Sequence, residues 1–154
     1  MSTKKVIKEI NFELEEIENL FDLYRNELFE IEREPNLLEL TGVASVLHSF
    51  YCGIEKIFLS IAKNIDENIP FDINWHKTLL SQMAKKNEHR EAVISDKAQT
   101  GLSDYLAFRH FYRHSYSSHL EWKKMKILVT PIKPTWERFY SEISSFLKAL
   151  EEKE

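Results

Sequence analysis

The strongest constraint on the fold is the regular spacing of apolar residues along the chain. Near the start they step alternately by four and three positions, at Ile10, Leu14, Ile17, Phe21, Tyr24, Leu28 and Ile31. This spacing draws one apolar stripe along an α-helix and is typical of helical bundles. We therefore expect a long first helix that ends before Pro35, with its glutamate-rich faces in solvent.

The same periodicity predicts a second long helix over about residues 37–64. Gly53 lies inside this helix and is expected where another helix packs closely, and Cys52 is expected to be a small core residue. A shorter helix is expected over about residues 72–83, with Asp72 as its N-cap. The first half of the chain is therefore expected to be helical throughout.

Two more helices are expected in the second half of the chain. One begins between Ser95 and Leu102 and ends near His114, because the hydroxyl-rich residues 115–118 compete with helical hydrogen bonds. Two prolines, at positions 131 and 134, indicate the start of the last helix. Its core stripe is expected to be Trp136, Phe139, Tyr140, Ile143, Phe146, Leu147 and Leu150. The predicted fold class is all-α, an up-and-down bundle of four or five helices.

Composition fits one helical domain over residues 1–154. The chain has 154 residues, 43% of them hydrophobic, and is long enough to bury a core. Its single cysteine excludes an internal disulfide, and the first residues lead into glutamate-rich sequence rather than an apolar signal core. No uncharged run approaches the roughly 18 residues of a membrane span. We expect a soluble, cytoplasmic protein without membrane association.

Most of the chemistry-bearing side chains stand in one stretch, Arg109-His110-Phe111-Tyr112-Arg113-His114-Ser115-Tyr116. Its spacing is Arg-x4-His-x-Tyr. The fork-shaped, permanently charged guanidinium of Arg suits the binding of a phosphate, and an imidazole suits proton transfer. Together these groups predict metal-free cleavage of RNA, in which the ribose 2′-OH attacks the adjacent phosphorus.

On a continuous helix, however, Arg109 and His114 would point roughly 140° apart, since each residue turns the helix by about 100°. They would not then meet on one phosphate. A helix end near His114 is expected to free that imidazole.

The motif, placed late in an all-helical chain of this size, resembles the HEPN ribonucleases, and among them the HepT-type toxins paired with an MNT nucleotidyltransferase antitoxin. Residues 53–58 also look like the second-helix pattern of the HepT-like group. The resemblance implies a HEPN-type bundle that forms a homodimer, in which two copies of the motif line one cleft and cut RNA, tRNA being one candidate, without metal or cofactor. It implies that Arg109 binds the scissile phosphate, that His114 is the general acid/base and that His110 assists.

The resemblance also assigns a role to Tyr116. It matches the motif tyrosine onto which an MNT antitoxin transfers AMP from ATP, and the bulky anionic adduct would block the phosphate site. The intervening residues 111–113 are bulkier and more basic than in commoner members of the group, which leaves the RNA preference open.

The net charge of −4 at first disfavours a nucleic-acid partner, but its distribution does not. Residues 1–40 carry five Lys/Arg and eleven Asp/Glu, whereas residues 101–138 carry seven Lys/Arg and three Asp/Glu. The positive charge therefore lies with the motif. The residues expected to hold RNA phosphates are Arg113, Lys123, Lys124 and Lys126.

Two other functions remain open from the residues alone. His110 and His114, four positions apart, could be metal ligands completed by His119 or Asp104, although the neighbouring arginines would repel a cation. The motif could also be the polar end of a non-catalytic helical module that binds RNA or protein.

Outside the motif, His76 and His89 are expected to be surface or packing residues, because neither has an acidic or Cys partner at ligand spacing. The polar run at residues 85–91 is expected to be a loop or a helix end.

Overall fold

The structure is a computed structural model that describes residues 3–153. Its elements are α1 (Thr3–Leu23), α2 (Arg25–Phe29), α3 (Leu37–Ile61), the π-helical turn η1 (Ala62–Asp66), α4 (Trp75–Met83), α5 (Asp96–His114), the 3₁₀ turn η2 (Ser117–His119), α6 (Trp122–Val129) and α7 (Ile132–Glu152). No β-strand occurs within the described residues, so the predicted all-α class is confirmed.

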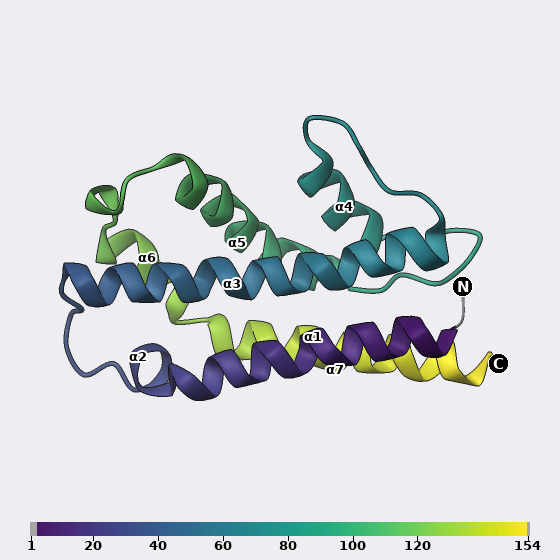
Figure 1. Cartoon of the computed structure of the whole chain (residues 1–154), viewed down its shortest axis with the longest axis horizontal. Helices are drawn as coiled ribbons and strands as arrows, with labels where there is room; N and C mark the ends of the chain where they lie inside the picture. The colour runs from purple at the N-terminus through teal and green to yellow at the C-terminus, as the bar shows by residue number, and fades with distance from the viewer. Residues whose placement is uncertain (1–2, 154) are drawn as a thin grey trace.

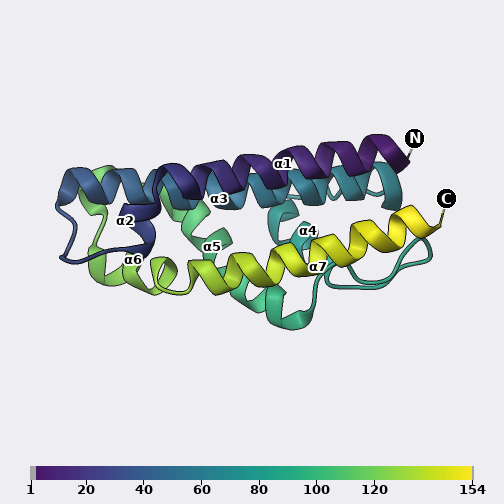
Figure 2. The ribbon, with the colours of Figure 1, turned by 90° about the horizontal axis from the view of Figure 1, so that it is seen from below.

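The four longest helices, α1, α3, α5 and α7, alternate in direction and form an up-and-down bundle, with both termini at the same end (Figure 1). Figure 1 shows α1 and α7 along one side of α3, and α4 and α5 on the other. In the view turned by 90°, α4 shows between α1 and α7, and α5 crosses behind α7 (Figure 2). The central position of α3 therefore gives it contact with both layers.

Helix α3 begins as the sequence predicted. Asn36 and Glu39 form a capping box, in which the Asn36 side chain accepts from the Glu39 backbone N–H at 2.9 Å. Arg33 adds a two-pronged ion pair to the Glu39 carboxylate, with both N···O distances 2.8 Å. The helix ends in η1, after which Glu67 adopts a left-handed conformation with φ 54°.

The α3 helix is also the one segment of the described chain that is long and apolar enough to cross a membrane, and half of its most apolar window is buried inside the bundle. Such burial is expected of the core helix of a soluble protein.

The prediction of one continuous first helix through Ile31 was wrong. The helix ends at Leu23, and Tyr24 has φ −113° and ψ 25°, outside the helical range. The short α2 then turns so that Leu28 is buried and the Phe29 ring meets Phe21 edge-on, 5.8 Å between centroids. The break in the helix therefore lets Leu28 and Phe29 cover the end of the core, which a straight helix would not do. Tyr24, at the break, is left exposed.

Two further expectations need correction. The helix after Pro70 begins at Trp75 rather than Asp72, and Asn74 occupies the N-cap position without a side-chain cap bond. Helix α6 was not predicted: its three lysines were considered only as contacts for RNA phosphates. By contrast, α5 begins where Ser95 accepts from the Ala98 N–H at 3.1 Å, within the predicted range.

The polar run at residues 85–91 forms the expected loop, but Arg90 points inward. Its guanidinium makes a two-pronged pair with the Asp66 carboxylate, with both N···O distances 2.7 Å and both side chains 2% exposed. Burial would raise the pKa of Asp66, but hydrogen bonds from Arg90, Gln82 and Asn87 outweigh it and hold that pKa below its usual value. This ion pair holds the loop before α5 against η1, the helical turn that follows α3.

Gly53 lies at the predicted close helix contact. A Cβ built on it would lie 2.9 Å from Cγ1 and Cδ1 of Ile17 on α1, closer than carbon atoms approach one another. Gly101 on α5, by contrast, has open space around the same position.

We predict that Gly53→Leu lowers the free energy of unfolding by about 1–3 kcal/mol, because overpacking forces α1 away from α3. Gly101→Leu should instead raise it slightly, since glycine is roughly 0.8–1.0 kcal/mol less favourable than alanine inside a helix and leucine ranks just below alanine. Urea denaturation of both variants and the parent measures this. Equal effects of the two substitutions would contradict close α1–α3 packing at Gly53.

Candidate functional site

The motif occupies the last turns of α5 and the segment after it. Helix α5 ends at His114, as predicted, and Ser115 follows in an extended conformation with φ −127° and ψ 159°. His110 and His114 are exposed on one face, with ring centroids 4.6 Å apart. Tyr116 is also extended, 78% exposed, and outside the helix. The end of α5 therefore presents two imidazoles and a phenol to solvent.

Arg109 points away from that face, toward the core. Its side chain is 13% exposed, and one terminal nitrogen lies 3.6 Å from Oε1 of Glu55 on α3. This ion pair is long, and Nε of Arg109 is buried with no hydrogen-bond partner among residues 3–153. A buried donor without a partner is costly in a folded protein. The guanidinium is thus held in place by a carboxylate through one long contact rather than by a full set of hydrogen bonds.

Glu55 is itself 5% exposed and has a second partner. Its Oε2 lies 2.8 Å from Nδ1 of His76 on α4. Because a carboxylate only accepts hydrogen bonds, this contact places a proton on Nδ1 and leaves Nε2 of the imidazole for another partner. The Trp75 ring packs against the same imidazole, 3.6 Å between centroids. Glu55 therefore connects α3, α4 and α5 at one point.

His76 packs against Trp75, as expected of a packing residue, but it also has an acidic partner that comes from another helix rather than from nearby sequence. A signal was present in the sequence. His48, Tyr51, Cys52 and Glu55 form a polar stripe at i, i+3, i+4 and i+7 within an otherwise apolar helix. A carboxylate at a core-facing position requires a partner, so this stripe marks the face of α3 that meets polar groups.

His48 and Cys52 fill the rest of that stripe. The His48 ring stacks on Tyr112 of α5, 4.7 Å between centroids, and its Nε2 lies 3.5 Å from the Cys52 thiol. Partial burial, and then the positive charges of Arg109 and Arg113, lower the pKa of His48, while Glu55 acts weakly in the opposite direction. Burial and the nearby Glu55 carboxylate raise the pKa of Tyr51. Cys52 is partly buried rather than a full core residue.

A cavity of about 750 Å³ opens between α4 and α5 next to this network. It is lined by Ile73, Asn74, His76, Lys77, Leu80, Gln99, Ser103, Leu106, Ala107, Arg109 and His110. The cavity therefore reaches two of the motif residues and the imidazole that Glu55 orients.

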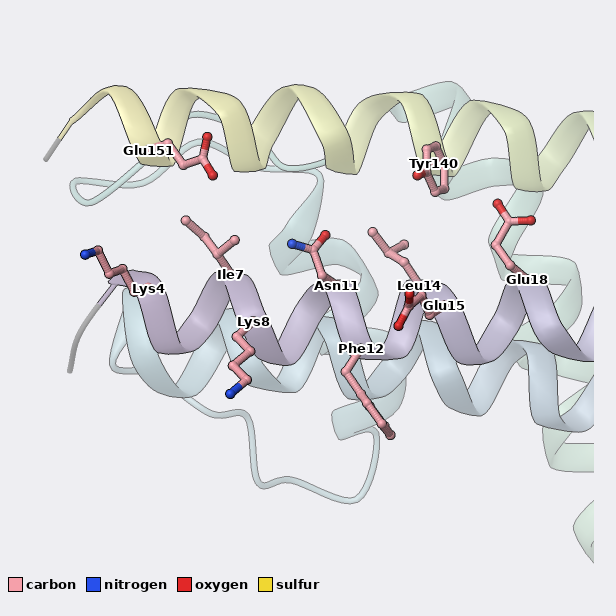
Figure 3. Close-up of a pocket in the computed structure, with 10 residues that line it drawn as sticks. All are labelled: Lys4, Ile7, Lys8, Asn11, Phe12, Leu14, Glu15, Glu18, Tyr140 and Glu151. Carbon is pink, nitrogen blue, oxygen red and sulfur yellow. The ribbon is translucent and has the colours of Figure 1, made fainter.

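A second hollow, of about 880 Å³, lies between α1 and α7. Figure 3 shows Tyr140 and Glu151 of α7 facing Ile7, Asn11 and Glu18 of α1 across it. Its lining includes no histidine and no arginine, and its three glutamates outnumber its two lysines, which disfavours a phosphate. Volume alone does not make it the candidate site.

The metal-site alternative lacks the ligands it requires. Within residues 3–153 no group of three His, Cys, Asp or Glu side chains is gathered closely enough to hold a metal ion. His110 and His114 lie side by side, but neither Asp104 nor His119 joins them.

The residues predicted to hold RNA phosphates are all exposed. Arg113 lies on α5 beside the motif histidines, and Lys123, Lys124 and Lys126 lie on α6. Lys124 is the one with a recorded ion pair, to Glu121 at 3.7 Å, and a pair so exposed contributes little. These cations are available to a polyanion.

The lowered pKa of His48 predicts a pH-dependent stability. As the pH falls, the unfolded chain takes up this proton before the folded protein does. The contribution of His48 to the free energy of unfolding is therefore present above about pH 6.5 and lost as the pH falls toward the folded-state pKa. We expect His48→Gln to flatten this part of the profile, measured by urea denaturation between neutral and mildly acidic pH. Parallel profiles for variant and parent would contradict this assignment.

Comparison with known proteins agrees with this architecture. The model of a family described as HepT-like protein matches residues 42–150, more than two thirds of the chain and the whole of the motif. No curated protein and no solved structure matches the sequence. HepT-like proteins lie within the HEPN superfamily of nucleases and toxins. The chain belongs to the HepT-like family.

Proposed function

We propose that this protein is a metal-independent endoribonuclease and the toxin of a toxin–antitoxin pair. The observation that carries the proposal is Arg109, whose side chain lines the cavity between α4 and α5 while an ion pair with Glu55 fixes its position. Exposed imidazoles follow on the same helix, at His110 and His114. Membership of a family within the HEPN nucleases supports this chemistry.

In the proposed reaction the ribose 2′-OH attacks the neighbouring phosphorus. A bond forms between O2′ and phosphorus, and the bond from phosphorus to O5′ breaks, which yields a 2′,3′-cyclic phosphate and a 5′-hydroxyl. Arg109 stabilises the charge that builds on the phosphate oxygens. His114 takes the proton from the 2′-OH and delivers it to the leaving O5′, with His110 assisting one helical turn away. Arg113, Lys123, Lys124 and Lys126 bind flanking phosphates.

The direction of the side chains argues for a site shared by two copies. Helix α5 is unbroken from Arg109 to His114, so these side chains leave it roughly 140° apart. Arg109 faces Glu55 in the core while His114 faces solvent. We propose that Arg109 of one protomer works with His114 of its partner in a homodimer.

A homodimer predicts a solution mass of twice the chain, measurable by light scattering. It also predicts complementation: mixing inactive Arg109→Lys protein with inactive His114→Ala protein should restore part of the RNA cleavage, because mixed dimers contain one intact site. An active monomer, or mixtures as inactive as their components, would contradict the shared site.

Each of these variants alone should lose RNA cleavage by about 10²-fold or more, since removal of a proton carrier or of an electrostatic stabiliser has effects of that size. Arg109→Lys is preferable to alanine because it keeps a positive charge beside buried Glu55. His89→Ala and Arg138→Lys, both at exposed positions, are the matched controls.

Cleavage that stops with EDTA and returns with zinc would overturn the metal-free mechanism. RNA binding without cleavage by the parent protein would indicate a non-catalytic module.

We further propose that an MNT-type nucleotidyltransferase is the antitoxin and that it transfers AMP from ATP to the Tyr116 hydroxyl. The phenol oxygen attacks the α-phosphorus, and pyrophosphate leaves. The extended backbone and 78% exposure of Tyr116 make its hydroxyl accessible to another enzyme. The adduct adds a negative charge beside the cations of the motif and competes with RNA phosphate.

Incubation with such an enzyme and ATP should add AMP to the protein, detected by intact mass and located by peptide mapping. Tyr116→Phe should escape modification and remain toxic, whereas Tyr140→Phe, the matched exposed tyrosine, should be modified and silenced. Normal modification of Tyr116→Phe would show that another residue is the acceptor.

A further inference from the structure

The cavity between α4 and α5 differs in charge from the rest of the molecule. The chain has a net charge of −4, yet none of the residues that line this cavity is Asp or Glu. Lys77, Arg109, His76 and His110 all contribute to its walls. The other hollows described on residues 3–153 each include at least one carboxylate. The lining therefore favours an anionic ligand at this place.

The same cavity has an apolar wall. Leu80 of α4 and Leu106 of α5 are both buried, and Ile73 and Ala107 extend the apolar surface outward. Asn74, Gln99 and Ser103 add hydrogen-bonding groups. An apolar wall with a few placed polar groups and a volume of several hundred Å³ is typical of small-ligand sites. A nucleotide has this combination, because its base is flat and weakly polar and its phosphate is anionic.

His76 is built to contact such a ligand. Glu55 accepts from Nδ1 at 2.8 Å and Trp75 packs against the ring, so the imidazole cannot turn freely. Its Nε2 is then the nitrogen left for a ligand in the cavity that His76 lines. The same carboxylate holds Arg109 through its other oxygen. One buried group thus orients two side chains of the cavity.

We propose that the cavity between α4 and α5 is a nucleotide subsite for single-stranded RNA, next to the phosphate that Arg109 binds. His76 and Lys77 contact the phosphate and ribose of this nucleotide, and the wall of Leu80 and Leu106 packs against its base. The inference rests on the proposed ribonuclease function and names residues outside the Arg-x4-His-x-Tyr motif. His76 is a substrate-binding residue, and Glu55 is a positioning residue that acts through it.

The test measures binding of a fluorescein-labelled, mixed-sequence, single-stranded RNA by anisotropy, at fixed salt, with full-length protein carrying His114→Ala to prevent cleavage. His76→Asn keeps a donor for Glu55 near the position of Nδ1 but removes Nε2. Ala107→Trp, at an exposed position on α5, fills the cavity without touching Glu55. Each should weaken the Kd roughly tenfold, the size expected for one lost charged hydrogen bond or an excluded nucleotide.

Matched controls separate the cavity from general effects of substitution. His89→Asn changes an exposed histidine with a glutamate neighbour outside this cavity, and Ala149→Trp changes an exposed alanine on α7. Both should leave the Kd unchanged. Thermal melting followed by circular dichroism checks the fold, and if His76→Asn does not fold, Ala107→Trp decides the question. An unchanged Kd in Ala107→Trp overturns the subsite.

Free nucleotide is distinguished by calorimetry with 5′-AMP. If Ala107→Trp abolishes AMP binding but leaves RNA binding intact, the cavity takes a free nucleotide and the proposal for RNA is overturned. The outcomes also separate the two proposals. If Arg109 and His114 prove essential for cleavage while the cavity variants leave the Kd unchanged, only the subsite fails. If the parent cleaves no RNA but the cavity variants weaken binding as predicted, the subsite stands without the nuclease.

Discussion

The arrangement of the candidate site depends on one buried carboxylate. Glu55 lies in the middle of the longest helix and is 5% exposed, where an unpaired charge would cost several kcal/mol. It is matched by His76 from α4 and Arg109 from α5, each on its own oxygen. Because both partners come from other helices, satisfying Glu55 also fixes how α4 and α5 sit on α3. The packing of α4 and α5 on α3 and the placement of the Arg109 guanidinium therefore depend on the same carboxylate.

The Glu55 network is looser than the other buried ion pair among residues 3–153. The Arg90–Asp66 pair shows what a complete buried ion pair in this chain looks like, with two contacts of 2.7 Å. The Arg109–Glu55 contact, at 3.6 Å, leaves donors unused. The looser contact, together with the place of Arg109 in the wall of the cavity between α4 and α5, is consistent with the proposal that this guanidinium binds a phosphate.

Much of the fold was predictable from the sequence because it depends on local periodicity. The apolar stripes predicted α3, α5 and α7, and the hydroxyl-rich residues 115–118 predicted the end of α5 at His114, while its start was placed only between Ser95 and Leu102. What periodicity missed depends on contacts between distant segments. The break at Tyr24 serves the packing of Phe29 on Phe21, and the partners of Glu55 lie 21 and 54 positions away in the chain. A helical pattern shows which face is buried but not which polar group it will meet.

The tight contact at Gly53 shows how closely α1 packs on α3. The family match starts at residue 42, after α1 and α2. Helix α1 nevertheless supplies five buried apolar residues. Its Ile17 lies so close to Gly53 of α3 that a Cβ there would clash with it. A fragment limited to the matched region would present that bare face of α3 to water as a continuous apolar strip, the kind of surface that drives self-association. The described residues before the match, 3–41, therefore cover part of the core, and we expect a shortened version of this protein to need α1 to remain in solution.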